Sequence, residues 1–514
     1  MKKALFLSIL LGGFYYSKAQ NMGFSKVYSF NGYTSLFMDA MMYNNQIIVS
    51  AYITDTMGDN WDVHALLHMN EQGEIQDTIF KRLPQPYYAS KKKLIKVNDD
   101  ILIFPGAFNN NAPILCIYQA DSLLTFKQFN FVNTQAFIIK DIILHSNGSL
   151  YVCLTQQDMN YDVNTVIIKL NSNYEEEWKL KYGGGSYSEI PNTFTEMPDG
   201  SILVGACKSN LNHTSNFFDP ELYPTWLFRI DTAGQLLNQW TNPDPMSWFP
   251  GAMAPTPDGG IVYAGAYTDY HSNGYAAVVN SITKLSNFSN VDWNLKLNST
   301  AGFNFIEDLI IHNNYIYACG YEYDTTSIHN GTNEIPLEFQ YGVLYKINLN
   351  GEIIFKYYYD VPLPLSESTG IHTPIPMLYS ISIPNDSTLL MAGEIRVSFS
   401  PPQPALPTQY GWLIKTNLQG CLAPNDCDYV GLEELLHQPL LRVWPNPATE
   451  TLSLQVDEHW LYSQFSILNL QGQTLQRGTL EAPLTILDVQ NRPPGLYLLR
   501  LTKNGKEHTV KWIK

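Results

Sequence analysis

The chain has 514 residues and a formal net charge of −16, with 45% hydrophobic and only 15% charged residues. Binding to nucleic acid or to an anionic membrane surface requires clustered Lys and Arg, and no basic stripe runs through the sequence, so both are excluded as main partners. The 33 Tyr, 33 Gly and 30 Pro favour strands and turns over helices.

The N-terminus has the pattern of an export signal. Lys2 and Lys3 precede an apolar stretch over 4–14, and a small-x-small site follows at 17–19. We therefore expect residues 1–19 to be a signal peptide. No later run reaches the roughly 18 apolar residues of a transmembrane segment. The mature protein is expected to pass the periplasm and to be secreted or attached to the outer-membrane surface.

One sequence unit recurs seven times between residues 37 and 420. Its most apolar strand begins at residues 47, 101, 150, 202, 261, 315 and 389, which lie 49 to 74 residues apart. A turn of Asn, Asp or Gly, residues that accept positive φ, precedes each of these strands. Four short strands per unit at this period predict an all-β fold, a seven-bladed β-propeller over 20–424.

The seventh unit lacks a fourth strand, whereas a spare strand occurs at 24–30. We expect this strand to pair with the last unit near 410–416 and to close the ring, which removes two open sheet edges. A six-bladed ring with one additional sheet is the alternative.

Two segments give the repeat a family likeness. Tyr182-Gly-Gly-Gly-Ser186 followed by 197–205, and the similar segment 257–265, resemble the repeat of many secreted Bacteroidetes propellers. The resemblance implies an architecture and no particular activity.

The last 73 residues have a different pattern from the repeats, and a linker is expected over 425–441. Residues 442–514 resemble a type A C-terminal sorting domain of the type IX secretion system, with Asn469 in place of the usual Asp. The resemblance implies a small β-sandwich that the type IX machinery recognises and removes; an ordinary terminal β-sandwich is the alternative. The residues that carry the motif are Pro445, Asn446, Pro447, Gly472, Gly495, Tyr497 and Lys514.

Six cysteines occur, and Cys421 and Cys427 stand close enough for a disulfide in an exported protein. Cys116, Cys153, Cys207 and Cys319 lie in apolar strands and are expected to be buried and free.

No motif for catalysis or metal binding was found. The sequence contains no His-Glu-x-x-His or Gly-x-Ser-x-Gly pattern, and no cysteine pair has zinc-finger spacing. The run Gly183-Gly184-Gly185 is explained by turn geometry, because no helix is predicted to follow it. We therefore predict no catalytic residue, no metal site and no cofactor.

The innermost strands suggest one candidate site. Five or six residues before the first turn of each unit stand Asp39, Lys93, Asp141, Thr193, Ala252, Asp308 and Ser380. First strands line the centre of a propeller, so Asp39, Asp141 and Asp308 are candidates for ligand binding there. The alternative is that they bond to backbone groups where neighbouring blades meet.

Long insertions suggest a second candidate site. All of them join strand ends on one face of the predicted ring, and such a face is the expected binding surface. Its aromatic residues suit stacking on a glycan or contact with a surface protein; packing on one another is equally consistent with their position. The candidates are Tyr88, Tyr187, Phe218, Tyr223, Trp248 and Phe249.

Three functions fit this sequence. The first is a non-enzymatic exported protein that binds a glycan, peptide or protein through the loop-rich face. The second is a secreted hydrolase or lyase with a site at the centre of the ring, and the third is a structural surface component. Converging carboxylates would favour an enzyme, and an aromatic groove would favour binding.

Overall fold

The computed structural model contains two compact units, Met1–Asp428 and Tyr429–Lys514. The border lies within the expected linker. Every regular element of the described residues is a strand or an isolated bridge, and the all-β prediction is confirmed. The described residues are 23–30, 33–55, 62–82, 93–98, 101–107, 113–119, 122–129, 134–158, 163–183, 187–210, 224–244, 247–270, 276–297, 304–324, 339–359, 374–397, 409–422, 442–444, 448–456, 461–469, 473–482, 484–493, 495–503 and 506–514. The expected signal peptide and the whole of the expected linker lie outside them.

The first unit consists of seven open, four-stranded antiparallel sheets, numbered here in chain order. Sheets 1 to 3 are β2 (Tyr33–Tyr43), β3 (Gln46–Asp55), β4 (Asp62–Met69) and β5 (Ile75–Arg82); β6 (Ile95–Lys96), β7 (Ile101–Ala107), β8 (Pro113–Gln119) and β9 (Ser122–Gln128); and β10 (Thr134–Leu144), β11 (Leu150–Asp158), β12 (Val163–Leu170) and β13 (Glu176–Tyr182).

Sheets 4 to 6 follow the same plan. They are β14 (Tyr187–Glu196), β15 (Ile202–Asn210), β16 (Thr225–Ile230) and β17 (Leu236–Thr241); β18 (Ser247–Pro255), β19 (Ile261–Tyr270), β20 (Ala276–Ser286) and β21 (Asn290–Lys296); and β22 (Phe305–His312), β23 (Tyr315–Asp324), β24 (Phe339–Asn348) and β25 (Ile353–Tyr359). Sheet 7 combines β26 (Pro374–Asn385), β27 (Thr388–Val397) and β28 (Gln409–Asn417) with β1 (Phe24–Tyr28).

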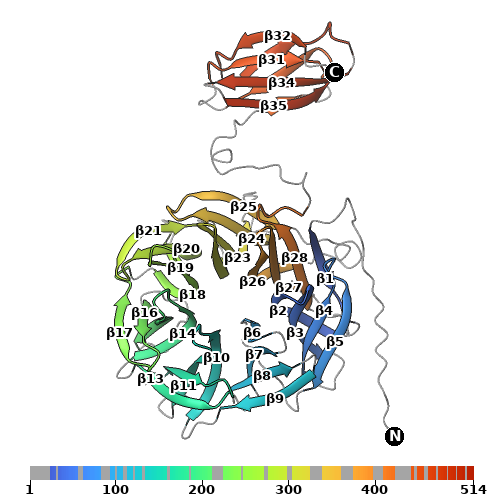
Figure 1. The fold of residues 1–514 in the computed structure, drawn as a ribbon. Helices are drawn as coiled ribbons and strands as arrows, with labels where there is room; N and C mark the ends of the chain where they lie inside the picture. The colour runs from blue at the N-terminus through green and yellow to red at the C-terminus, as the bar shows by residue number, and fades with distance from the viewer. Residues whose placement is uncertain are drawn as a thin grey trace, which may run out of the picture. The chain divides into compact units, whose positions relative to one another are not determined.

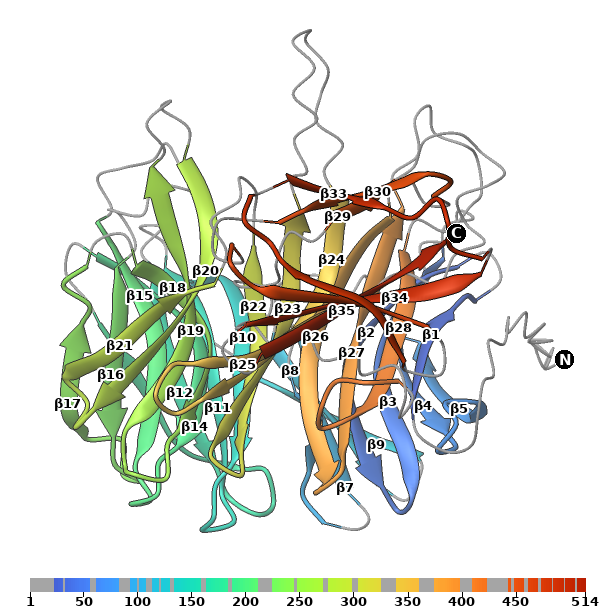
Figure 2. The same ribbon diagram turned by 90° about the horizontal axis from the view of Figure 1, so that it is seen from above.

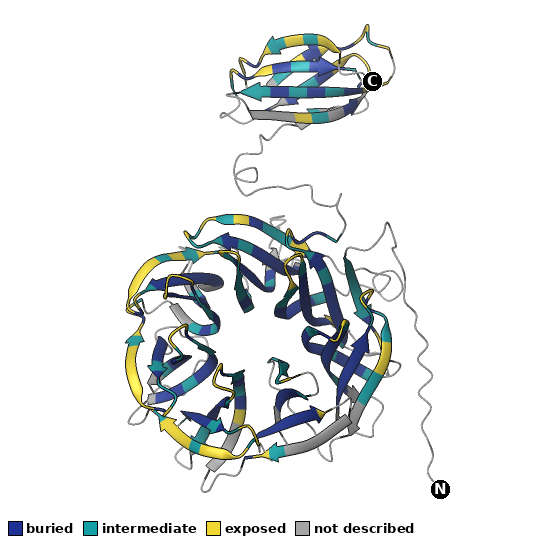
Figure 3. Ribbon diagram, in the orientation of Figure 1, coloured by how far each residue is buried: buried dark blue, intermediate teal, exposed yellow. Residues whose placement is uncertain are grey.

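The sheets of this unit lie side by side around a common centre, with the first strands innermost (Figure 1). Viewed at a right angle, their strands run along the axis of the arrangement (Figure 2). Hydrophobic cores fill the space between neighbouring sheets, and the core of sheets 7 and 1 joins Leu390 and Leu413 to Phe37 and Val49. The outer strands are the exposed ones (Figure 3).

Strand β1 completes sheet 7. It pairs antiparallel with β28, from Phe24 opposite Lys415 to Tyr28 opposite Gly411. The Tyr28 hydroxyl donates to the carbonyl of Gly73 in sheet 1, 2.6 Å away. Fourth-strand tyrosines make the same contact elsewhere: Tyr182 donates to Gly234 (2.6 Å) and Tyr359 to Gly420 (2.8 Å). The N-terminal strand therefore makes the same contact to the next sheet as a fourth strand.

The turns explain why these segments form hairpins. Asn44 and Asn45 have φ of 49° and 62°, the left-handed values that a two-residue hairpin turn requires. In the second hairpins an Asn or Asp side chain bonds to the turn backbone; Asn348, for example, accepts from the N–H groups of Asn350 and Glu352. These local preferences fix where each sheet turns.

The second unit has two sheets. One has the order β29 (Arg442–Trp444), β30 (Thr451–Gln455), β33 (Leu484–Asp488); the other has the order β32 (Thr474–Thr479), β31 (Gln464–Leu468), β34 (Leu496–Lys503), β35 (Lys506–Ile513). Leu452 and Leu487 of the first sheet share a core with Phe465, Leu499 and Trp512 of the second.

Candidate functional site on the inner strands

The first strand of most sheets has a register irregularity next to the position singled out in the sequence. Pairing shifts between Phe37 and Asp39, between Ile139 and Asp141, and between Ile306 and Asp308. The same shift precedes Thr193 and Ser380. An extra residue in one strand re-aims the next side chain. The shift thereby turns Asp39, Asp141 and Asp308 toward the neighbouring sheet.

The three aspartates bond across sheet junctions by one rule. Each carboxylate accepts the N–H of the next residue in its own strand, and its second oxygen accepts an N–H from the following sheet. The donors from the following sheet are Leu94 for Asp39 (2.6 Å), Phe194 for Asp141 (3.1 Å) and Ile381 for Asp308 (3.1 Å). The donors from the same strand are Ala40 (2.8 Å), Ile142 (3.0 Å) and Leu309 (2.9 Å).

This geometry fits the interpretation that the aspartates join blades through their backbone. Asp39 and Asp141 are buried, and both oxygens of each carboxylate already accept backbone hydrogen bonds. Among the residues that the structure describes, no group of three or more His, Cys, Asp or Glu side chains is placed to hold a metal ion. A role for these aspartates in ligand binding stays a prediction.

Lys93 balances the negative charge at the centre. The charge of Asp141 raises the pKa of Lys93, with Asp308 and Asp39 adding to the effect, while burial acts in the opposite direction. Burial raises the pKa of Asp39 to about 6; the hydrogen bond from Leu94 opposes this shift and the charge of Asp308 adds to it. One lysine thus serves as counter-ion to aspartates from three sheets.

Several of the aligned residues line one small cavity. Its lining residues are Lys93, Asp141, Thr193, Gly251, Ala252, Glu307, Asp308, Tyr379 and Ser380. All the aligned positions except Asp39 are among them. The volume that the centre of a water molecule can occupy in this cavity is about 20 Å³, so the cavity has room for about one water molecule.

A second charged cluster at the inner strands was missed in the sequence. Glu394 is fully buried, and its Oε1 accepts from the Tyr379 hydroxyl and from Arg396 Nε and Nη2, both 2.7 Å away. Burial and the charge of Glu394 raise the pKa of Tyr379. The only sequence signal was Glu-Ile-Arg on one strand, where alternate residues share a face.

The predicted aromatic residues are only partly described. Phe249 is half-buried, has φ of 55° and packs against Ala266 together with Phe305. It lies in the widest irregularity of a first strand, between the pairs Trp248–Ala266 and Ala252–Ala264. The side chains of Tyr187 and Trp248, and the whole of Tyr88, Phe218 and Tyr223, lie outside the described residues.

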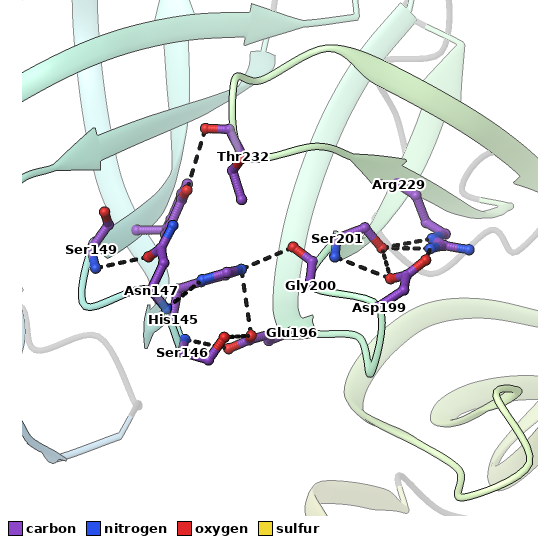
Figure 4. Close-up of polar contacts among 11 residues, drawn as sticks. His145, Ser146, Asn147, Ser149, Glu196, Asp199, Gly200, Ser201, Arg229 and Thr232 are labelled. Atoms are coloured by element: carbon purple, nitrogen blue, oxygen red, sulfur yellow. Dashed lines mark hydrogen bonds and ion pairs between the residues drawn. The ribbon is translucent and has the colours of Figure 1, made fainter.

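The tight-turn end of sheets 3 and 4 holds a polar cluster with a structural role (Figure 4). His145 Nδ1 accepts the N–H of Asn147 (3.1 Å) and its Nε2 donates to the Gly200 carbonyl (2.9 Å). Ser146 N–H donates to Glu196 Oε2 at 2.8 Å. These bonds join the two turns.

The described sorting-motif residues lie at one end of β34 and β35. Tyr497 stacks on Trp512 with ring centroids 4.9 Å apart, and its hydroxyl donates to the Pro493 carbonyl at 2.7 Å. The backbones of Gly495 and Lys514 exchange hydrogen bonds of 2.9 and 3.2 Å. Pro445, Asn446, Pro447 and Gly472 lie outside the described residues.

The cysteines divide as expected where they can be seen. Cys116, Cys153, Cys207 and Cys319 are buried and free. Cys421 is disulfide-bonded, and its predicted partner Cys427 lies outside the described residues.

Comparison with known families bears on the second unit. Residues 442–514 match the family of secretion system C-terminal sorting domains. The chain carries a type IX sorting domain. A chain with this domain is cargo that the secretion system delivers to the cell surface or beyond. The described part of the chain includes no helix with the length and apolar character needed to cross a membrane.

No curated protein matches the sequence. Among solved structures, PorZ, a surface component of the type-IX secretion system of Porphyromonas gingivalis, is 10% identical over 93% of this chain, with a TM-score of 0.40. The chain spans 59% of PorZ.

Two further structures cover most of the first unit. The polysaccharide lyase Uly1 is 12% identical with a TM-score of 0.45, over 74% of this chain and 89% of its own. The β-propeller domain of the Trilobed protease of Pyrococcus furiosus is 9% identical with a TM-score of 0.37, over 73% and 99%. Likeness at these scores carries no argument about activity.

Proposed function

We propose that residues 24–422 form a seven-bladed β-propeller closed by β1, which binds a glycan, peptide or protein through its loop-rich face after type IX export through the periplasm. Seven four-stranded sheets in ring order, and the contact of Tyr28 with Gly73, support the architecture. Export of the chain follows from the sorting domain.

The observation that carries the binding proposal is how the connections divide between the two ends of the sheets. Short turns such as 44–45 and 313–314 join first to second strands, and short turns such as 70–74 join third to fourth strands. The long connections 211–223, 325–338 and 398–408 join second to third strands, and 360–373 joins two sheets. Both kinds of long connection therefore lie at the other end of the sheets, the end at which the first strands begin. Long connections gathered on a rigid scaffold are typical of binding sites.

Aromatic side chains lie at the inner margin of this face. Phe249 and Phe305 precede Ala252 and Asp308 on their first strands, so they lie nearer to the loop-rich face than the central cavity does. The ring of Phe305 in turn contacts the ring of Tyr321, with ring centroids 5.8 Å apart. Such rings offer flat apolar surface to a sugar or to a protein side chain.

Converging carboxylates would favour the rival proposal of a hydrolase or lyase, but Asp141 and Asp308 at the central cavity each accept two backbone hydrogen bonds. The cavity also has room for only about one water molecule. A tyrosine that removes a proton needs a lowered pKa. Tyr379, which lines the central cavity, has a raised pKa because it is buried beside Glu394.

The test uses the purified mature chain on a glycan array and as bait for cell-surface proteins. Phe249→Ala and Trp248→Ala are compared with Leu237→Ala, a half-exposed residue on the outer strand β17. We expect Phe249→Ala to weaken capture by about tenfold or more, and Leu237→Ala to leave it unchanged. Unchanged capture of every ligand by both aromatic variants would rule out this face.

A further inference from the structure

The described motif residues of the sorting domain stabilise its fold and offer little contact surface. Tyr497 is only 6% exposed, and Trp512 beneath it is fully buried. The last residue, Lys514, continues the ladder through its backbone bonds to Gly495. A partner that reads the folded domain must therefore contact surface other than this stacked pair.

Strand β33 is an open sheet edge with an apolar surface. It lies at the end of the order β29, β30, β33. Its central residue, Ile486, is 63% exposed, while Leu487 beside it is buried in the core. Strand β33 has no charged residue before Asp488, and the Asp488 carboxylate accepts the N–H of Gln490 at 2.9 Å.

The other edges of the two sheets carry charge, which discourages the addition of a further strand. Arg442 is in β29 and Arg477 in β32, while β35 includes Lys506, Glu507 and Lys511. Among the described edges of this unit, β33 is thus the one best suited to accept another strand.

The backbone of β33 is oriented for strand addition at Ile486. The N–H of Val489 donates to the Glu450 carbonyl at 2.8 Å, toward β30. Backbone groups alternate in direction along an antiparallel strand. Leu487 and Thr485 therefore face β30 as Val489 does, whereas the N–H and C=O of Ile486 point to the open side.

We propose that β33 is the docking strand of the sorting domain, and that an extended segment of the secretion machinery adds to its open edge at Ile486. Main-chain bonds of the added strand would supply affinity, and the Ile486 side chain would supply an apolar contact. The inference rests on the sorting role of residues 442–514 and is independent of what the propeller binds. A second copy of this chain is the competing occupant.

The test follows export of the full-length chain in a host that has the type IX system. Ile486→Pro removes only an N–H that points to the open side, and Ile486→Lys places a charge there. Leu475→Lys, at a residue 44% exposed on the edge strand β32, is the matched control. The measurement is the fraction of chain at the cell surface and in the medium against the fraction retained inside the outer membrane.

We expect both Ile486 variants to lower the exported fraction about tenfold with an unchanged melting temperature, and Leu475→Lys to be exported as the wild type is. Normal export of a folded Ile486→Lys or Ile486→Pro chain would overturn the proposal. If both variants unfold, the exported fraction of Ile486→Thr, which keeps a β-branched residue, is measured instead and judged by the same criterion.

Sedimentation of the purified chains tests whether a second copy of this chain occupies the edge of β33. A wild-type dimer that Ile486→Lys dissociates without loss of export would assign the edge to a second copy and contradict the proposal. Ligand capture by the propeller is measured on the same variants and is expected to stay normal, so failure of either proposal is recognised separately.

Discussion

Asp39, Asp141 and Asp308 show how one residue type at one repeat position joins neighbouring sheets. A buried carboxylate is costly unless hydrogen bonds and a counter-charge offset its desolvation. Each aspartate receives one N–H from its own strand and one from the next sheet. Lys93 supplies the positive charge. The arrangement therefore links sheets 1 to 2, 3 to 4 and 6 to 7.

Replacing Asp141 with Ala tests this role. The change leaves the N–H of Phe194 and the hydroxyl of Thr193 without their acceptor in a buried site. We expect the free energy of unfolding to fall by about 3 kcal/mol, measured by urea denaturation. Asp386→Ala, at an exposed turn, is the control and is expected to change little. Equal stability of the two variants would contradict the role given to Asp141.

The pKa of Asp39 predicts an unusual pH dependence. Its folded value of about 6 lies above the ordinary aspartate value of about 3.9. The folded chain therefore binds this proton more tightly than the unfolded chain, and the resulting stability is present below the unfolded pKa and lost as pH rises through 6. Between pH 4 and pH 8 we expect the wild type to lose about 2 kcal/mol relative to Asp39→Asn. Parallel stability profiles of the two proteins would show that the shift is absent.

At this scale the sequence left two roles open for the aligned aspartates, ligand binding or bonds to backbone groups at the blade junctions, and it did not give the individual bonds. Alignment of the seven units places Lys93, Asp141 and Asp308 at equivalent positions, and the structure brings them to one cavity. Which backbone N–H each carboxylate accepts depends on how far neighbouring sheets are shifted relative to one another. The sequence of a single strand does not determine that shift. Glu394 and Arg396 were missed because their partner Tyr379 comes from the neighbouring strand β26 of the same sheet, and the register of β26 with β27 cannot be read from either strand alone.

At the scale of elements, the irregular first strands require a residue without a side chain at the facing position of the second strand. The residue that faces the irregularity in β27 is Gly393, where an added Cβ would lie 1.9 Å from the Met377 carbonyl oxygen. Gly320 in β23 meets the Phe305 carbonyl in the same way. A side chain at either position would push the two strands apart.

Gly393→Ala is therefore expected to lower the free energy of unfolding by about 3 kcal/mol, measured by thermal or urea denaturation. Gly200→Ala is the comparison, because nothing lies within 4 Å of a Cβ there, although its φ of 76° favours glycine. We expect a loss of about 1 kcal/mol at Gly200. A smaller loss at Gly393 than at Gly200 would argue against the close approach.

The contact of β1 with sheet 1 gives a second prediction for an element. Tyr28→Phe removes the hydroxyl that donates to Gly73, and Tyr182→Phe removes the equivalent bond between sheets 3 and 4. We expect each to lower the free energy of unfolding by about 1 kcal/mol. Loss at Tyr182 without loss at Tyr28 would mean that β1 does not act as a fourth strand.

The strands and turns were the most predictable elements because their signals are local. The apolar run that begins at 47 lies within β3 and the run that begins at 389 within β27, and paired Asn residues mark the turns before β3 and β23. The short strand β6 has no such run, because Lys96 and Val97 follow Ile95 directly. Its place depends on pairing with β7.

For the whole molecule, export follows from the second unit, and ligand binding is our proposal for the first. The sorting domain has its own core, and the seven sheets have theirs. The ring order leaves each sheet packed on two neighbours, and β1 covers the edge that β28 would otherwise expose. The proposed closure of the ring would give the loop-rich face a rigid support.

The most direct test of this account is a disulfide between β1 and β28. Phe24 and Lys415 are register partners, so Phe24→Cys with Lys415→Cys is expected to cross-link in the folded, oxidised protein without loss of thermal stability. Phe24→Cys with Asn417→Cys, two residues out of register, is expected to cross-link poorly. Absence of the in-register cross-link in the folded chain would contradict closure of the ring by its own N-terminal strand.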